Sequence, residues 1–147
     1  MKDKFFLIII LLLLASCENQ AKKDQEMESK TQKVIFQIHD SLMASMDKLM
    51  NLQEKLKKHN LKADFKITGK APDSLILSQK MEHAYLALDS SNQQMMNWMN
   101  AFKPDYKGKD HASTMNYLET ELAKLKKIDS LTKTSMKAAD SLVNHEK

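Results

Sequence analysis

Glycine and proline are scarce in this chain, which has only two of each among its 147 residues. Both residue types interrupt helices and form tight turns, so their scarcity favours long helices. β-Sandwiches, barrels and glycine-rich nucleotide-binding folds need many such turns and are excluded. The single cysteine excludes a disulfide framework and a zinc site built from the cysteines of one chain. The length fits one domain.

Arginine is absent, because all 23 basic residues are lysine. With 19 acidic residues, the formal net charge is +4, which is small for a nucleic-acid-binding domain. A chain without arginine also lacks the bidentate hydrogen-bond donors that read guanine and phosphate. We therefore expect no nucleic-acid partner.

The N-terminus combines two lysines, an apolar run from Phe5 to Leu14, and small residues before Cys17. The run is shorter than the roughly 20 residues that cross a bilayer as a helix, and the pattern is typical of a secretory signal peptide. The sequence LASC at residues 14–17 resembles the lipobox of bacterial lipoproteins. That resemblance implies diacylglycerol on the Cys17 sulfur, removal of residues 1–16 and acylation of the new amino terminus. The alternatives are an uncleaved signal anchor and a buried free cysteine.

Residues 17–30 are polar after the cysteine and contain no aromatic side chain, which predicts a flexible tether between the lipid and the folded domain. More than one acyl chain is needed for stable anchoring. The expected location is the outer membrane of a Gram-negative bacterium, on its periplasmic face. The membrane is then a partner through the lipid anchor, and an envelope protein is a further possible partner.

Helix breakers divide the remaining domain, residues 31–147, into three segments. All glycines and prolines lie in two places, Gly69 with Pro72 and Pro104 with Gly108, which predicts helices over about 31–60, 73–102 and 110–146. Short connections favour antiparallel neighbours, so we expect an all-α, antiparallel, up-down-up three-helix bundle resembling a coiled coil. For residues 60–71 two alternatives remain: the first helix continues to about Lys66, or a loop folds back and caps the bundle.

Apolar residues at helical spacing form one stripe on each predicted helix. The predicted core residues are Ile35, Ile38, Leu42, Leu49, Leu52 and Leu56; Leu77, Met81, Ala84, Leu88, Met95, Met99 and Phe102; and Met115, Leu118, Leu122, Leu125, Met136, Ala139 and Val143. Asp73 or Ser74 can cap the second helix, and Asp110 or Ser113 the third. Polar residues also occupy stripe positions, where they either set the register from within the seam or lie exposed. These residues are Ser45, Asn92, Asp129 and Thr132.

Three segments resemble a family of small Bacteroidota envelope lipoproteins. They are IHDSLMASMDKLMNLQEKLKK at residues 38–58, MMNWMNAFKP at 95–104 and TMNYLETELAKLKK at 114–127. Members often carry the label "viral A-type inclusion protein", which reflects generic coiled-coil similarity. The resemblance covers the signal peptide and nearly all of the remaining chain. It implies an envelope location and a helical fold, and it adds no catalytic residue or cofactor.

No catalytic motif is found, because the chain has neither the G-x-S-x-G sequence nor a phosphate-binding loop, and Cys17 is assigned to lipid. We expect no enzyme activity and no cofactor. The methionines are the one group with possible ligand chemistry. In an antiparallel bundle they lie level with an imidazole, and thioether and imidazole together can hold Cu(I) or Ag(I). The residues of this candidate site are His39, Met95, Met96, Met99 and Met115. Methionine is also an ordinary gap-filler of helical cores, which is the simpler interpretation.

Trp98 and Phe102 form the other candidate site, near the turn at Pro104. An exposed tryptophan is a common anchor for a protein partner. The alternative is that Trp98 packs in the core against the first helix near Phe36. Taken together, the sequence predicts a lipid-anchored, non-catalytic interaction or scaffold module of the cell envelope. The alternatives are a small methionine-rich periplasmic binder of soft metal ions such as Cu(I), and an accessory subunit of an enzyme.

Overall fold

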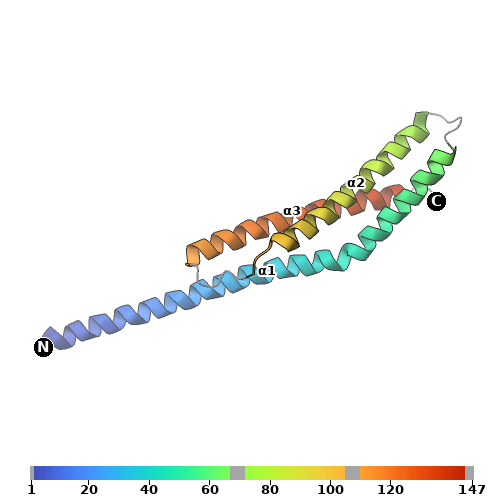
Figure 1. The fold of residues 1–147 in the computed structure, drawn as a ribbon. Helices are drawn as coiled ribbons and strands as arrows, with labels where there is room; N and C mark the ends of the chain where they lie inside the picture. The colour runs from blue at the N-terminus through green and yellow to red at the C-terminus, as the bar shows by residue number, and fades with distance from the viewer. Residues whose placement is uncertain (1, 67–71, 105–109, 145–147) are drawn as a thin grey trace.

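The structure, a computed structural model, describes the backbone of residues 2–66, 72–104 and 110–144, and the side chains of 19–59, 75–104 and 110–144. Within these residues it contains no strand and three helices, α1 (Lys2–Lys66), α2 (Pro72–Ala101) and α3 (His111–Asn144). All three helices pack against one another, with α1 and α3 parallel and α2 antiparallel to both (Figure 1). The predicted all-α, up-down-up bundle is confirmed.

Helix α1 is longer than predicted at both ends. It continues to Lys66, as in one of the two alternatives for residues 60–71. It also includes residues 17–30, where the sequence predicted a flexible tether. Side chains one turn apart stabilise this segment as helix: Gln20 donates to Asp24 at 2.7 Å, and Lys30 pairs with Glu26 at 2.7 Å. The N-terminal part of α1 therefore extends as a helix beyond the other two helices (Figure 1).

The signal-peptide and lipidation predictions fall on residues whose side chains lie outside those described. This applies to Cys17 and to the apolar run before it. Within the part of the chain that the structure describes, no helix has an apolar stretch long enough to span a membrane. The helix predicted to end at residue 146 is described as far as Asn144.

Helix α3 begins with an aspartate cap. The backbone N–H of Ser113 donates to Oδ1 of Asp110 at 2.9 Å, and the Ser113 hydroxyl donates to Oδ2 at 2.7 Å. These bonds, with the backbone bond as the largest cause, lower the pKa of the Asp110 carboxyl. The prediction of a cap at Asp110 is confirmed. The side chains of Asp73 and Ser74, the predicted caps of α2, lie outside the described residues.

The inward-facing residues of every helix alternate between spacings of three and four. Such a 3.5-residue repeat keeps one seam facing the neighbouring helices and produces the left-handed supercoil of a coiled coil. The seams are Ile35, Ile38, Leu42, Ser45, Leu49, Leu52 and Leu56 in α1; Met81, Ala84, Leu88, Ser91, Met95 and Trp98 in α2; and Thr114, Leu118, Glu121, Leu125, Ile128, Thr132, Ser135 and Ala139 in α3. The coiled-coil character predicted from the sequence is present in all three helices.

The apolar core is divided along the bundle axis into two clusters. The first lies toward the N-terminal end of α1 and contains Ile35, Leu42, Met95, Trp98, Leu118, Leu125 and Ile128. The second lies toward the C-terminal end of α1 and contains Leu49, Leu52, Leu56, Met81, Ala84, Leu88 and Ala139. Met46 packs against both. Helix α1 also bends in its middle, in the cyan part of the ribbon in Figure 1.

Candidate functional site

Four aromatic rings join the three helices at the end of the bundle where α2 stops. Trp98 stacks on Phe102 with ring centroids 4.8 Å apart, and Phe102 stacks on Tyr117 of α3 at 6.1 Å. Phe36 of α1 meets Phe102 edge-on at 6.1 Å. The backbone N–H of Lys103 donates to the Tyr117 hydroxyl at 2.8 Å, which fixes the chain as it leaves α2. The cluster is a packed junction of all three helices.

Trp98 belongs to this junction and is only 6% exposed. The core alternative, packing near Phe36, is therefore the one that the structure has. An exposed partner anchor at Trp98 is not available, and Phe102 is half-buried beside it. The indole Nε1 of Trp98 is buried and has no hydrogen-bond partner among the described residues. Burying a hydrogen-bond donor without a partner lowers the stability of the fold. The apolar packing of the indole ring must offset this loss.

Of the residues proposed to hold a soft metal ion, three methionines and His39 lie in or beside the first core cluster, and one methionine lies outside it. Met95 is fully buried in the first core cluster, where Met99 and Met115 pack partly buried against it. Met96 instead lies on the outer surface. His39 packs beside Trp98 with ring centroids 6.0 Å apart, and its Nδ1 lies 2.9 Å from a carboxylate oxygen of the adjacent Asp40. Among the described residues, no group of three or more His, Cys, Asp or Glu side chains is arranged to hold a metal ion.

A layer of hydroxyl groups lies between the two core clusters. Ser91 is fully buried, and its hydroxyl donates to the carbonyl of Ala87 at 2.9 Å. It also lies 3.5 Å from the buried hydroxyl of Ser135 on α3. The Thr132 hydroxyl donates to Ile128 at 2.8 Å within the same helix. These small polar residues occupy seam positions that leucine fills elsewhere, so less apolar packing crosses the middle of the bundle.

Helix α1 contributes Ser45 to this layer. Its hydroxyl donates to the carbonyl of Leu42, three residues back, at 2.7 Å. Serine bonds of this kind draw on the helix's own carbonyls and favour a bend, which accounts for the curvature of α1 here. Of the four polar residues that the sequence placed in the stripes, Thr132 is buried and the other three are half-buried. Ser45 lies in the seam of α1, whereas Asn92 and Asp129 lie beside seam positions.

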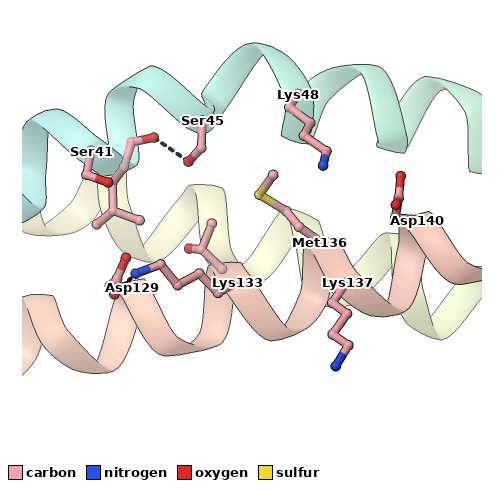
Figure 2. Close-up of a pocket in the computed structure, with 10 residues that line it drawn as sticks. Ser41, Ser45, Lys48, Asp129, Lys133, Met136, Lys137 and Asp140 are labelled. Atoms are coloured by element: carbon pink, nitrogen blue, oxygen red, sulfur yellow. Dashed lines mark hydrogen bonds and ion pairs between the residues drawn. The ribbon is translucent and has the colours of Figure 1, made fainter.

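A groove of about 320 Å³ opens between α1 and α3 beside the hydroxyl layer (Figure 2). Its floor is Leu42 and Met136, and its walls carry three ammonium groups and two carboxylates. Lys133 pairs with Asp129 at 2.7 Å, whereas Lys48 projects from α1 across the groove (Figure 2). The groove exists because small side chains in the seam and the bend of α1 leave space that a leucine layer would fill. Its lining suits water or a small polar molecule.

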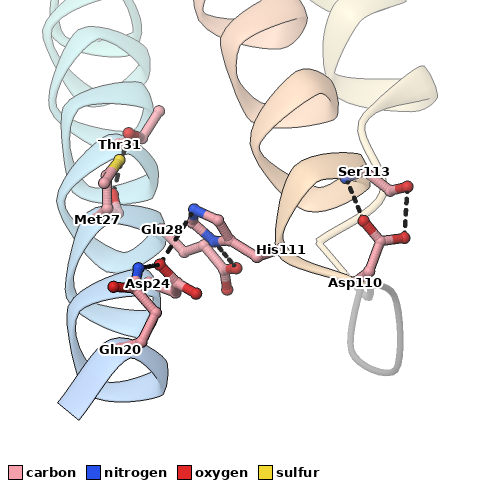
Figure 3. Close-up of polar contacts among 8 residues, drawn as sticks. All are labelled: Gln20, Asp24, Met27, Glu28, Thr31, Asp110, His111 and Ser113. Atoms are coloured by element: carbon pink, nitrogen blue, oxygen red, sulfur yellow. Dashed lines mark hydrogen bonds and ion pairs between the residues drawn. The ribbon is translucent and has the colours of Figure 1, made fainter. Parts of the chain in front are cut away.

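An imidazole connects α3 to the N-terminal extension of α1 (Figure 3). His111 Nδ1 lies 2.8 Å from Glu28 Oε1, and His111 Nε2 lies 3.6 Å from Asp24 Oδ1. The two carboxylates face opposite nitrogens of the ring. Asp24 and Glu28 continue the 3.5-residue seam of α1 back from Ile35 through Thr31. From the sequence alone, His111 was not paired with any residue. The seam spacing of Asp24 and Glu28 could have indicated that these two carboxylates face the other helices.

The most unusual seam residue, Glu121, was also absent from our sequence prediction. It is 5% exposed and lies between Leu118 and Leu125 in the seam of α3. Its carboxylate pairs at 2.7 Å with Lys124, which remains largely in solvent. A buried carboxylate normally needs such a partner. The seam spacing separates Glu121 from the neighbouring exposed Glu119, because Glu121 lies three residues after Leu118 and four before Leu125.

Comparison with known proteins gave no assignment: no protein-family model, curated protein or solved structure matched the chain.

Proposed function

We propose that this chain is a lipid-anchored, non-catalytic interaction module of the bacterial cell envelope, held at the outer membrane through Cys17. The sequence LASC at residues 14–17, preceded by a basic start and an apolar run, carries the proposal. A lipid on Cys17 supplies the membrane attachment, since each buried CH₂ group contributes about 0.8 kcal/mol and several chains together hold firmly. The periplasmic face is the proposed side.

The fold supports an interaction role through its surface. Large apolar side chains are exposed along α1 and α2, although the bundle already has a complete seam of its own. Clusters of exposed apolar residues mark interaction sites more often than isolated ones do. A bundle of three helices is also a rigid way to present such residues to a partner in the envelope.

Metabolic labelling tests the anchor. Cells that express the tagged chain are fed an alkyne analogue of a fatty acid, and the label is read on the protein together with its distribution between membrane and soluble fractions. The natural chain should carry the label and sediment with the outer membrane. Cys17→Ser should lose the label, whereas the matched control Ser16→Ala, which keeps a small residue before the cysteine, should retain both. Labelling of Cys17→Ser, or none of the natural chain, would overturn the anchor.

Crosslinking in intact cells tests the interaction role. The natural chain should give one recurring crosslinked partner, and Cys17→Ser, released from the membrane, should lose it. Trp98→Ala is unsuitable as an interface control because Trp98 is buried, so the substitution removes core packing. Self-crosslinks alone, or a partner captured equally by Cys17→Ser, would contradict an envelope interaction module.

A further inference from the structure

One face of the bundle, formed by α1 and α2 together, combines exposed methionines with acidic residues. Its positions between residues 36 and 54 of α1 and between 82 and 100 of α2 include no lysine, and Lys57 and Lys58 border it at the next turn of α1. His39 of α1 contacts Trp98 of α2, and Phe36 contacts Phe102 directly after α2, so the side of α1 that carries them faces α2. The other side of α1, with Ser41 and Lys48, faces α3 across the groove. The face between α1 and α2 is thus defined by geometry and is separate from that groove.

We name this surface the methionine face. It comprises nine positions on α1 and nine on α2: Phe36, His39, Asp40, Met43, Met46, Asp47, Met50, Gln53 and Glu54, and Glu82, Tyr85, Leu86, Asp89, Asn92, Gln93, Met96, Met99 and Asn100. Five of the eighteen are acidic and none is lysine, in a chain with 23 lysines and a net charge of +4. The formal charge of this face is therefore −5, opposite in sign to that of the chain as a whole.

Methionines on the two helices lie at matching heights. The contacts of Phe36 with Phe102 and of His39 with Trp98 set the antiparallel register, which brings Met43 level with Met96. Met43 is 42% exposed, Met96 48% and Met50 61%. On α1, Phe36, His39, Met43, Met46 and Met50 follow the alternating three- and four-residue spacing of a second coiled-coil seam. Phe36, His39 and Met46 of this row also pack on the bundle, whereas Met43 and Met50 are exposed.

We propose that the methionine face binds an amphipathic helix of another protein, one with an apolar stripe flanked by lysine or arginine. The 3.5-residue spacing fits the apolar stripe of a helix laid along the groove between α1 and α2. Methionine side chains are unbranched and flexible, so they adapt to different apolar partners. The proposal rests on the interaction role proposed above and names the surface and the chemistry of its partner.

Charge decides among the possible occupants. A second copy that presented the same face would bring two surfaces of formal charge −5 together, and like charges suppress association. An anionic lipid surface is repelled for the same reason. A basic helix is attracted instead, because acidic residues border the methionines on both helices. Asp47 on α1 and Glu82 on α2 lie on the two borders; Glu54 is partly neutralised by Lys58, which pairs with it at 2.6 Å.

The test uses methionine-methyl NMR on the full chain in nanodiscs of zwitterionic lipid. The probe is a synthetic helix of about 20 residues with a leucine stripe and lysine flanks, long enough to cover the methionine row. The methyl signals of Met43, Met50 and Met96 should shift on binding, whereas that of Met27 should not. Met27 is a matched control because it lies on the same helix, outside the face, and is 48% exposed. Empty nanodiscs correct for binding of the probe to lipid.

Variants sharpen the test. Met43→Gln combined with Met96→Gln should weaken binding about tenfold, because two apolar contacts are lost while helix propensity is kept. Met27→Gln should bind as the natural chain does, and Asp47→Lys should bind more weakly, with a smaller dependence on salt. Circular dichroism and melting temperature confirm that each variant is folded.

Several outcomes would overturn the proposal. They are equal shifts at Met27, unchanged affinity of the double variant, and equal binding of a leucine helix flanked by glutamate. Concentration-dependent shifts of Met43 and Met96 without probe would show that a second copy occupies the face, and would overturn it too. If the probe fails to bind but crosslinking in cells still finds an anchor-dependent partner, the interaction role stands and only the methionine face is refuted.

Discussion

Glu121 offers the sharpest test of how this bundle is stabilised. The residue lies in a coiled-coil seam between two leucines and is 5% exposed, yet it is ionisable and pairs at 2.7 Å with Lys124. Withdrawing a carboxylate from water costs several kcal/mol, and a half-exposed lysine returns only part of that. We therefore expect the seam to be more stable with an apolar side chain at this position.

The decisive substitution is Glu121→Met, which keeps an unbranched chain of similar length. Burying a methionine side chain contributes about 1.5–3 kcal/mol, and replacing a buried ion pair by apolar residues is commonly neutral to about 4 kcal/mol stabilising. The free energy of unfolding should rise by about 1–3 kcal/mol. For a chain of this size each kcal/mol raises the melting temperature by about 3 °C. Glu121→Gln, which removes the charge but keeps a polar group, should give a smaller gain.

Urea unfolding followed by circular dichroism measures these changes, with the slope against urea used to check that the transition keeps its two-state form. Lys124→Ala serves as the complementary variant. It leaves the carboxylate without its partner and should destabilise by less than about 1 kcal/mol, since the lysine is largely exposed. A loss of stability in both Glu121→Met and Glu121→Gln would refute the reasoning, because it would show that the charge itself stabilises the seam.

Three further predictions concern other parts of the chain. Because the folded state lowers the pKa of Asp110, its cap stabilises α3 above the unfolded pKa and loses this effect as the pH falls through the folded one. The melting temperatures of the natural chain and Asp110→Ala should therefore differ at neutral pH and converge as the pH falls through the folded pKa of Asp110, and a constant difference would contradict the cap. Ser45→Ala removes the 2.7 Å bond to the backbone and should straighten α1, seen as a longer distance between spin labels near its ends; an unchanged distance would assign the bend to another cause. If soft metal ions bind the candidate site that contains Met95 and Met99, Ag(I) should raise the melting temperature of the natural chain but not of Met95→Leu combined with Met99→Leu. An unchanged melting temperature at excess metal would contradict metal binding.

The sequence predicted α1 and α2 well because their seams are mostly apolar. Leu42, Leu49 and Leu56 of α1 and Met81 and Leu88 of α2 were expected in the core and are buried there. Apolar periodicity locates a seam only where apolar residues occupy it. The two breaks at the glycine–proline pairs also gave both ends of α2 and the start of α3 to within one residue, whereas α1 begins far earlier than predicted.

Helix α3 was predicted less accurately for the same reason. Half of its seam is polar. The prediction therefore chose large apolar residues that lie beside the seam instead of the polar residues within it. Met115, Leu122 and Met136 are half-buried there, whereas Thr114, Glu121 and Ser135 are buried. Extending a strict alternation of three and four residues in both directions from Leu118 and Leu125 would have identified the polar members. The burial of Trp98 was harder to predict, because the sequence spacing places this residue only near the stripe. The packed structure shows that the ring of Phe102 stacks on it.

The hydroxyl layer between the two core clusters has a consequence for how the bundle opens. We expect each cluster to open as a separate cooperative unit, so that amide hydrogen exchange reports two opening free energies rather than one. In the second cluster α3 contributes only Ala139 to the fully buried set, while α1 and α2 contribute leucines and a methionine. The C-terminal turns of α3 should therefore detach at lower cost than any other described part of the core. Such a detachment would free one end of the α1–α2 pair while the aromatic junction keeps the other end closed.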